Sequence, residues 1–340
     1  EQAYERLSEI TVLDPTCGSG AFLFAALEIL ADLYMTLMER AQELVDAGSR
    51  MPEFLNEAQR HPNLRYFVLR SAQLNNLYGV DIMAEAGEIA RLRLFLKLAA
   101  QLEHRDQIEP FPDLDLNIKT GNLLVGIADQ EDAERRFSSS ILASAVFDKI
   151  AGVVEESAEI FGAFIAAQTR SDAPEVLRGL KEALQERAEG LRTEVDRMLH
   201  DMRTEPEMLE DWVASHQPFH WFLEFPEVLS RGGFDVILGN PPYIPVPNVK
   251  DYVAMGYQTT SCPDIYALCI ERSVGLLGDA GWISMITPHS LMQSSRFVPL
   301  RDFLTSHLSD CWTSSYGRIP AGLFRNDTRV RNSVVVGRIG

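Results

Sequence analysis

A short apolar run followed by a proline-rich turn constrains the fold of this chain more than any other feature. Phe234–Leu238 has the length and composition of a buried strand, and Gly239–Tyr243 (Gly-Asn-Pro-Pro-Tyr) follows at once. The glycine permits a sharp turn, and the two prolines fix φ and remove two backbone donors. Open α/β sheets bind ligands at the carboxyl ends of their strands. The sequence therefore predicts a stiff, ligand-facing loop rich in oxygen acceptors.

These acceptors suit a substrate that carries an amino group. The side-chain oxygen of Asn240 and the carbonyl of Pro241 could each accept one amino hydrogen. Pro242 stiffens the loop, and Tyr243 offers a flat face on which a base can stack. A proline-rich turn that merely closes a strand fits the bare motif equally well. A second motif is needed to decide between the two interpretations.

A glycine-rich turn near the N-terminus has the form of a cofactor loop. Ile10–Leu13 predicts a strand, Asp14–Gly20 (Asp-Pro-Thr-Cys-Gly-Ser-Gly) follows it, and a helix is predicted from Ala21 to about Leu44. A turn between strand and helix lets a cofactor approach the backbone closely, at the helix N-terminus. The missing G-x-G-x-x-G pattern argues against a nicotinamide dinucleotide.

Together the two motifs resemble those of S-adenosylmethionine-dependent DNA adenine-N6 methyltransferases, with D-P-x-C-G-S-G as the cofactor motif and N-P-P-Y as the catalytic loop. Trp221–Val228 (W-x-L-E-F-P-E-V) further resembles the methylase part of type IIG restriction–modification enzymes and of BREX- or DISARM-like phage-defence methyltransferases. The resemblance spans nearly the whole chain. It implies transfer of a methyl group from S-adenosylmethionine to N6 of an adenine extruded from double-stranded DNA.

The resemblance also implies which residues form the site. The catalytic residues would be Asn240, Pro241, Pro242 and Tyr243, and the stacking residues Tyr243 and Phe324. A larger set would bind S-adenosylmethionine: Asp14, Pro15, Thr16, Cys17, Gly18, Gly20, Phe22, Asp81, Ile82, Asn122, Leu123, Asn240 and Asp264. Cys17 is not expected to be a nucleophile, because direct transfer to an amine needs no covalent intermediate.

Asp81 and Asn122 each have a structural alternative. Asp81 ends a predicted strand at 77–81, where an acid can accept hydrogen bonds from ribose hydroxyls. It could instead cap the next helix, predicted at 83–102. Asn122 follows a third predicted strand, at 114–119, and could be a turn asparagine.

Two C-terminal candidates are open in the same way. Asp264 heads a helix predicted to end at Leu277 and could be an ordinary N-terminal helix carboxylate. Phe324 precedes the last predicted strand, at 333–336, and could be a core side chain. A further strand is predicted at 282–286.

Residues 128–218 differ in sequence pattern from the rest of the chain. Apolar residues recur at helical spacing among many acidic ones, which predicts a helical insertion. Heptads do not persist over four repeats, so a surface insertion is favoured over a partner-binding coiled coil. The predicted fold is an α/β, Rossmann-like class I methyltransferase sheet, mostly parallel, with a cofactor-binding half at 1–127 and a catalytic half at 219–340.

Composition limits the environment and the partners. The formal charge of −18 argues against the whole surface being a nucleic-acid face. The expected partners are double-stranded DNA and, in a defence system, further subunits. No membrane association is expected, since no apolar run approaches about 20 residues, and four scattered cysteines favour the cytoplasm. No metal is expected, because His216 and His220 lack a third ligand.

Three further expectations concern function and completeness. The resemblance predicts a trimmed catalytic core of a longer protein, because relatives have a segment before the cofactor motif and a DNA-recognition domain after the catalytic part. N-P-P-Y-like loops also serve smaller enzymes that methylate protein glutamine or guanine N2 of RNA. A non-catalytic defence-complex scaffold would have no need to bind S-adenosylmethionine.

Overall fold

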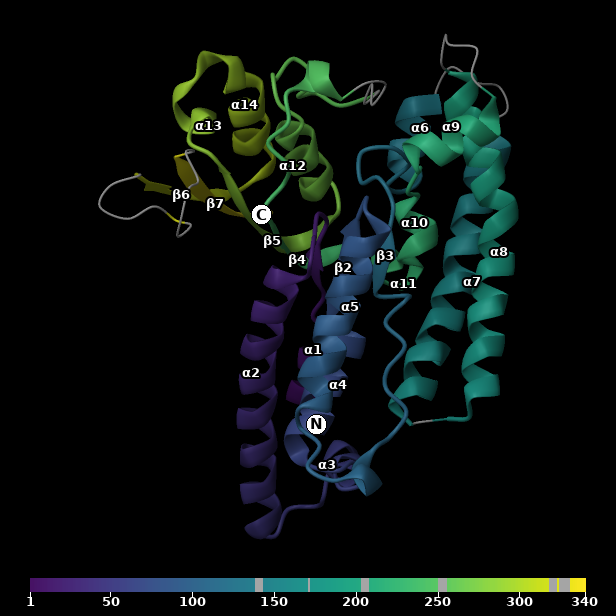
Figure 1. The fold of residues 1–340 in the computed structure, drawn as a ribbon, viewed down its shortest axis with the longest axis vertical. Coiled ribbons are helices and arrows are strands. Elements are labelled where there is room, and N and C mark those ends of the chain that lie inside the picture. Colours follow the sequence, from purple (N-terminus) through teal and green to yellow (C-terminus); the bar gives the residue numbers. More distant parts are fainter. Residues whose placement is uncertain (138–142, 171, 203–207, 250–255, 318–322, 324–330) are drawn as a thin grey trace. The chain divides into compact units, whose positions relative to one another are not determined.

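The computed structural model contains two compact units. Figure 1 labels the helices and strands along the chain. The described residues are 1–137, 143–170, 172–202, 208–249, 256–317, 323 and 331–340. The first unit consists of Glu1–Thr120 and Phe164–Leu177, and the second of Gly121–Ala163 and Arg178–Gly340. The functional division predicted from the sequence, at 1–127, 128–218 and 219–340, stays a prediction.

The first unit holds three parallel strands in the order β3–β2–β1. They are β1 Val12–Asp14, β2 Leu77–Asp81 and β3 Ile118–Thr120. Nearly all side chains of β1 and β2 are buried, as expected of parallel strands. The strand predicted at 114–119 is shorter than expected, because the chain still turns before Ile118: the N–H groups of Asn117 and Ile118 donate to Leu114 O.

Helices make up most of the rest of the first unit. They are α1 Gln2–Glu9, α2 Ala21–Asp46, α3 Glu53–Ala58, α4 Leu64–Asn75, α5 Ala84–Ala99 and the 3-10 helix η1 Arg105–Gln107. The helix predicted from Ala21 to about Leu44 is confirmed as α2, whereas α1 was not predicted. By length and composition α2 could cross a membrane, but a core helix passes the same test. Leu23, Leu27 and Tyr34 of α2 are fully buried.

The second unit holds the other four strands in the order β4–β5–β7–β6. They are β4 Phe234–Gly239, β5 Leu277–Pro288, β6 Asp310–Tyr316 and β7 Asn332–Arg338. β4 and β5 are parallel, and β7 is antiparallel to both of its neighbours. The seven strands are mostly parallel, so the predicted α/β class is confirmed.

The remaining helices fall into two groups. Those of the insertion are α6 Gln130–Phe137, α7 Ala143–Thr169, α8 Pro174–Asp201 and α9 Leu209–His216. They belong to the second unit, except for Phe164–Leu177, which holds the end of α7 and the start of α8 and belongs to the first. The others are α10 Trp221–Glu224, α11 Pro226–Ser230, α12 Tyr266–Val274, α13 Ser290–Gln293, α14 Val298–His307 and the 3-10 helices η2 Val246–Asn248 and η3 Ser295–Phe297. The helix predicted to reach Leu277 ends at Val274, and β5 begins at Leu277.

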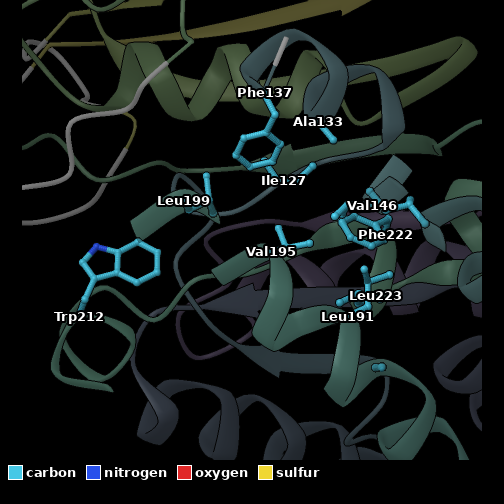
Figure 2. Packing of buried hydrophobic residues seen from close by; sticks show 12 residues of the cluster. Ile127, Ala133, Phe137, Val146, Leu191, Val195, Leu199, Trp212, Phe222 and Leu223 are labelled. Carbon is cyan, nitrogen blue, oxygen red and sulfur yellow. The ribbon is translucent and has the colours of Figure 1, made fainter. Parts of the chain in front are cut away.

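The insertion packs in a hydrophobic cluster that it shares with α10 (Figure 2). Helices α7 and α8 lie side by side (Figure 1), with Lys149 Nζ 2.8 Å from the Glu194 carboxylate. Side chains from α6 to α9 meet side chains of α10 in one cluster that includes Phe137, Val195, Trp212 and Phe222. Burial of this apolar surface fixes the insertion on the segment that leads into β4.

The W-x-L-E-F-P-E-V segment, Trp221–Val228, contributes side chains to this cluster and to the contact with β4. Trp221 and Phe225 are buried, and the Phe225 ring meets the ring of Phe234, the first residue of β4, edge-on at 5.7 Å. His220 accepts a hydrogen bond at Nδ1 from Ile127 N, so Nε2 donates to Asp196 Oδ1 on α8, at 3.0 Å. His220 is therefore a core histidine with both ring nitrogens paired.

Candidate active site

The turn between β1 and α2 creates the first part of the site. Gly18 has φ +51°, and open space lies where a side chain would be. Gly20 has φ +75°, and a Cβ there would lie 2.9 Å from Ala90 Cβ. Both glycines are thus required by the backbone, as the cofactor-loop interpretation predicts.

Asp14, the last residue of β1, is a fully buried carboxylate. Its Oδ1 accepts a hydrogen bond from Thr16 N at 3.1 Å. Its Oδ2 and the Thr16 hydroxyl are buried without a partner among the described residues. Burial, with a contribution from Asp81, raises the pKa of Asp14 to about 7. A cation or a hydrogen-bond donor at this position would satisfy Oδ2.

Asp81, the last residue of β2, forms two hydrogen bonds, one of which is to the glycine turn. Its Oδ2 accepts from Gly18 N at 2.8 Å, and its Oδ1 accepts from Met83 N at 2.9 Å. The first bond joins two segments 63 residues apart in the sequence. The second is a turn bond to the residue before α5, and it does not cap that helix, because Met83 is the N-cap residue and α5 has no side-chain cap hydrogen bond. Each oxygen still has a lone pair, so the proposed ribose contact stays a prediction.

The remaining N-terminal candidates surround this turn. Pro15 and Cys17 are buried, Phe22 is partly buried, and Ile82 is 40% exposed. Burial raises the pKa of the Cys17 thiol, which keeps it protonated and unsuited to nucleophilic attack. The turn offers a buried carboxyl oxygen and open space over Gly18, and Ile82, after β2, adds an exposed apolar side chain. These features fit a cationic, ribose-bearing cofactor such as S-adenosylmethionine.

The Asn-Pro-Pro-Tyr loop starts directly after β4, as predicted. Asn240 is partly exposed and Pro241 is buried. Tyr243 Oη donates to Asn240 Oδ1 at 2.6 Å and also lies 3.1 Å from Ile286 O on β5. Burial raises the pKa of Tyr243 to about 12, so the phenol stays protonated at neutral pH.

Three residues outside the Asn-Pro-Pro-Tyr motif hold Tyr243 in place, and the sequence predicted none of them in this role. Asn332 Nδ2 donates to Tyr243 Oη at 3.3 Å. Tyr266 of α12 meets the Tyr243 ring edge-on, with centroids 6.1 Å apart, and Phe297 stacks on Tyr266 at 5.0 Å. No motif marks these residues, because the contacts join positions 23 to 89 residues from Tyr243 and ordinary polar or aromatic side chains make them.

Asn122 and Leu123 lie after β3, in the second unit. Asn122 Oδ1 accepts from Leu124 N at 3.1 Å, and its backbone N–H donates to Gln217 O at 2.9 Å. This is the turn role that the sequence left open. The Asn122 amide Nδ2 is nevertheless buried without a partner among the described residues, and Leu123 is buried.

Asp264 lies next to the end of the catalytic loop. It forms an isolated antiparallel bridge with Pro245, and the following N–H, of Ile265, donates to Ile244 O at 2.9 Å. Burial raises the pKa of the Asp264 carboxyl, and Arg296 opposes this shift. Phe324, the second predicted stacking residue, lies outside the described residues.

A buried ion pair connects α12 to the base of the insertion. Arg272 donates to Asp132 Oδ2 at 2.9 Å, to Tyr257 Oη at 2.8 Å and to Gly126 O at 3.0 Å. Burial alone would raise the pKa of Asp132, but Arg272 and Arg136 hold it below its usual range. The pair joins four segments of the second unit: the loop after β3, α6, the loop before α12, and α12 itself.

Comparison with known proteins identifies the family. Residues 75–316 match the model of Eco57I restriction-modification methylases, and residues 1–132 match that of the MmeI DNA-methyltransferase domain. The chain belongs to the Eco57I restriction-modification methylase family. The two motifs therefore predict the family correctly.

Individual relatives of this methylase are longer proteins. A Methanocaldococcus jannaschii protein described as a type II restriction enzyme and methyltransferase is 28% identical, over 87% of this chain and 27% of the relative. The adenine-specific methyltransferase PglX of Lacticaseibacillus casei is 22% identical, over 89% of this chain and 21% of the relative. The solved type IIL restriction-modification enzyme MmeI, in complex with DNA, is 12% identical over 99% of this chain and 32% of that chain, with a TM-score of 0.45. The chain thus spans about a quarter of the length of the curated relatives it matches.

Proposed function

We propose that this methylase is the catalytic core of a DNA adenine-N6 methyltransferase of a restriction–modification or phage-defence system. The observation that carries the proposal is the pair of acceptors after β4, Asn240 Oδ1 and the Pro241 carbonyl, on a loop without a donor at either proline. An exocyclic amino group has two hydrogens to donate to two such acceptors. Family membership and the adenine-specific relative favour adenine in double-stranded DNA as the substrate.

S-adenosylmethionine, if bound, supplies an electrophilic methyl group on a sulfonium. Asp14, Gly18 and Asp81 would hold it, because the Asp14 oxygen is unpaired among the described residues and the space over Gly18 is open. Asn240 and Pro241 would orient the amino group and draw its hydrogens into the plane of the two acceptors. The amine nitrogen would gain the methyl group, the carbon–sulfur bond of the sulfonium would break to leave a neutral thioether, and one amine proton would pass to solvent. The rate acceleration would come from the alignment of the amine with the methyl donor, and no strong base is needed.

The first test is the Asn240→Ala variant of the full-length protein. It removes one acceptor and is expected to lower transfer of tritiated methyl groups to DNA by at least about a hundredfold, as the loss of an oriented polar group in an active site does. Binding of S-adenosylmethionine, measured by calorimetry, is expected to stay within about twofold of wild type. Undiminished transfer by the variant would overturn the proposal.

The substrate is identified by sequencing. Single-molecule sequencing of genomic DNA with and without the gene is expected to reveal N6-methyladenine at one recognition sequence only when the gene is present. A duplex with that sequence then serves as the assay substrate. Labelled protein or RNA in place of labelled DNA would contradict adenine methylation and indicate a glutamine- or guanine-modifying enzyme.

A further inference from the structure

Three polar side chains, two of them from the catalytic loop, form a continuous chain of hydrogen bonds. Asn332 Nδ2 lies 3.3 Å from Tyr243 Oη, and Tyr243 Oη lies 2.6 Å from Asn240 Oδ1. The second acceptor near the hydroxyl is Ile286 O, at 3.1 Å. The chain thus links the first residue of β7 to the side chain proposed to accept the amino hydrogen.

The chemistry of these groups fixes the direction of the chain. A phenol has one proton to donate, whereas a carboxamide oxygen and a peptide carbonyl can only accept. The Asn332 amide nitrogen can only donate, so it occupies a lone pair of the hydroxyl oxygen. The hydroxyl proton must then point to an acceptor, and the Asn240 oxygen is the closer of the two. Hydrogen bonds in such a chain strengthen one another.

The far end of the chain is rigid. Asn332 is 3% exposed, and as the first residue of β7 its Cα pairs with Pro288 on β5 and with Tyr316 on β6. The preceding carbonyl, Arg331 O, accepts from His289 N at 2.8 Å. Asn240, in contrast, is partly exposed on a loop. The sheet can therefore fix the orientation of the Asn240 carboxamide through the tyrosine.

We infer that Asn332 is a positioning residue, which directs the Tyr243 hydroxyl proton to Asn240 Oδ1 and so orients this acceptor for the substrate amine. This inference rests on the proposed function. Tyr243 then has two roles, since its ring faces the base and its hydroxyl holds the asparagine. The Asn240 oxygen keeps its second lone pair for an amino hydrogen. Because the phenol stays protonated to high pH, the donor is present throughout the working range.

Four variants of the full-length protein separate these roles. Tyr243→Phe keeps the ring and removes the hydroxyl, and Asn332→Asp keeps the shape and removes the donor. Asn332→Ala removes the side chain, and Asn332→Ala combined with Tyr243→Phe completes a double-mutant cycle. Ser333→Ala is the matched control, because this neighbouring buried serine contacts His289 and Ser315.

Each single change is expected to lower single-turnover methyl transfer about three- to tenfold, the effect of one net hydrogen bond. The affinity for S-adenosylmethionine and the 2-aminopurine fluorescence of an extruded target base are expected to stay at the wild-type value. The double variant is expected to be no slower than Tyr243→Phe alone, since Asn332 acts only through the hydroxyl. Ser333→Ala is expected to transfer at the wild-type rate.

Two kinetic results would overturn the inference. Additive losses in the cycle would mean that Asn332 does not act through the tyrosine. Faster transfer by Tyr243→Phe would mean that the hydroxyl blocks the Asn240 oxygen and does not orient it.

A structural comparison decides the matter without reference to activity. Crystal structures of the wild type and of Asn332→Ala are expected to differ in the Asn240 carboxamide, with the contact to Tyr243 Oη lost or lengthened in the variant. An unchanged contact would overturn the inference. Wild-type protein without any methyl transfer would refute the proposed function alone, because this comparison would still test the hydrogen-bond chain.

Discussion

At the residue scale, burial alters the ionisation of Asp14 in the candidate cofactor turn. Its carboxyl is fully buried, one of its oxygens has no partner among the described residues, and its pKa is about 7 because burial disfavours the charge. The unfolded chain loses this proton near pH 4. The folded chain keeps it until about pH 7. Between these values the unfolded state binds fewer protons, so the contribution of Asp14 to stability is lost as the pH rises.

The Asp14→Asn variant tests this assignment. The amide oxygen can still accept from Thr16 N, but the side chain no longer ionises. Relative to wild type, the variant is expected to gain stability as the pH rises from 4 to 8, at about 1.4 kcal/mol for each unit of pKa difference. Chemical denaturation at several pH values measures this gain. A difference between the two proteins that is independent of pH would contradict the raised pKa.

A second prediction concerns the loop after β3, which approaches the segment leading into α10 very closely. Gly126 has φ +122°, and a Cβ at this position would overlap the Phe219 carbonyl. Phe219 N donates to Val125 O at 2.7 Å, so the approach is held by the backbone. Gly126→Ala is expected to cost at least about 1–3 kcal/mol of unfolding free energy, because of both the clash and the positive φ.

Gly179 provides the matched control for Gly126. It lies on α8, and among the described residues no atom other than those of its chain neighbours and the nearby backbone of its own helix lies within 4 Å of the place where its Cβ would be. Gly179→Ala is expected to stabilise the protein by about 0.4–1 kcal/mol, because alanine restricts the unfolded chain and favours helix. Urea unfolding compares the two variants. Equal effects of the same sign would contradict the close approach at Gly126.

The elements that the sequence predicts are those with a strong local pattern. β1, β2 and β4 are apolar and bounded by turn residues, and α2 starts after a glycine turn, so all four were predicted. β6 was not predicted, because Asp310–Tyr316 is an edge strand whose residues are mostly exposed and lack apolar alternation. The side-chain partners of Tyr243 were missed for a different reason. They come from β7, α12 and η3 and meet only in the folded chain.

At the scale of the whole molecule, the residues predicted to bind the cofactor fall into both units. Asp14–Phe22, Asp81 and Ile82 belong to the first unit, whereas Asn122, Asn240 and Asp264 belong to the second. The glycine turn and the carboxylates of Asp14 and Asp81 are in the first unit, so most of the cofactor binding energy is expected there.

This division leads to a prediction for the demethylated product, S-adenosylhomocysteine. At about a hundred times its dissociation constant the ligand is expected to stabilise the protein by about 2.7 kcal/mol. Hydrogen exchange is expected to show protection at residues 14–20 and 79–83, to the same extent in Asn240→Ala, but not in Asp81→Ala. Protection confined to residues 121–340 would refute the assignment of the cofactor site.

The Arg272–Asp132 pair has a consequence for engineering. A guanidinium deprived of its carboxylate in the interior costs about 3–5 kcal/mol, whereas replacing both charges by apolar groups is often tolerated. Asp132 lies in α6, the first helix of the insertion, and Arg272 lies in α12, outside the insertion. An insertion transplanted from another member of the family must therefore bring an acidic residue at this position, or the recipient arginine must be changed with it.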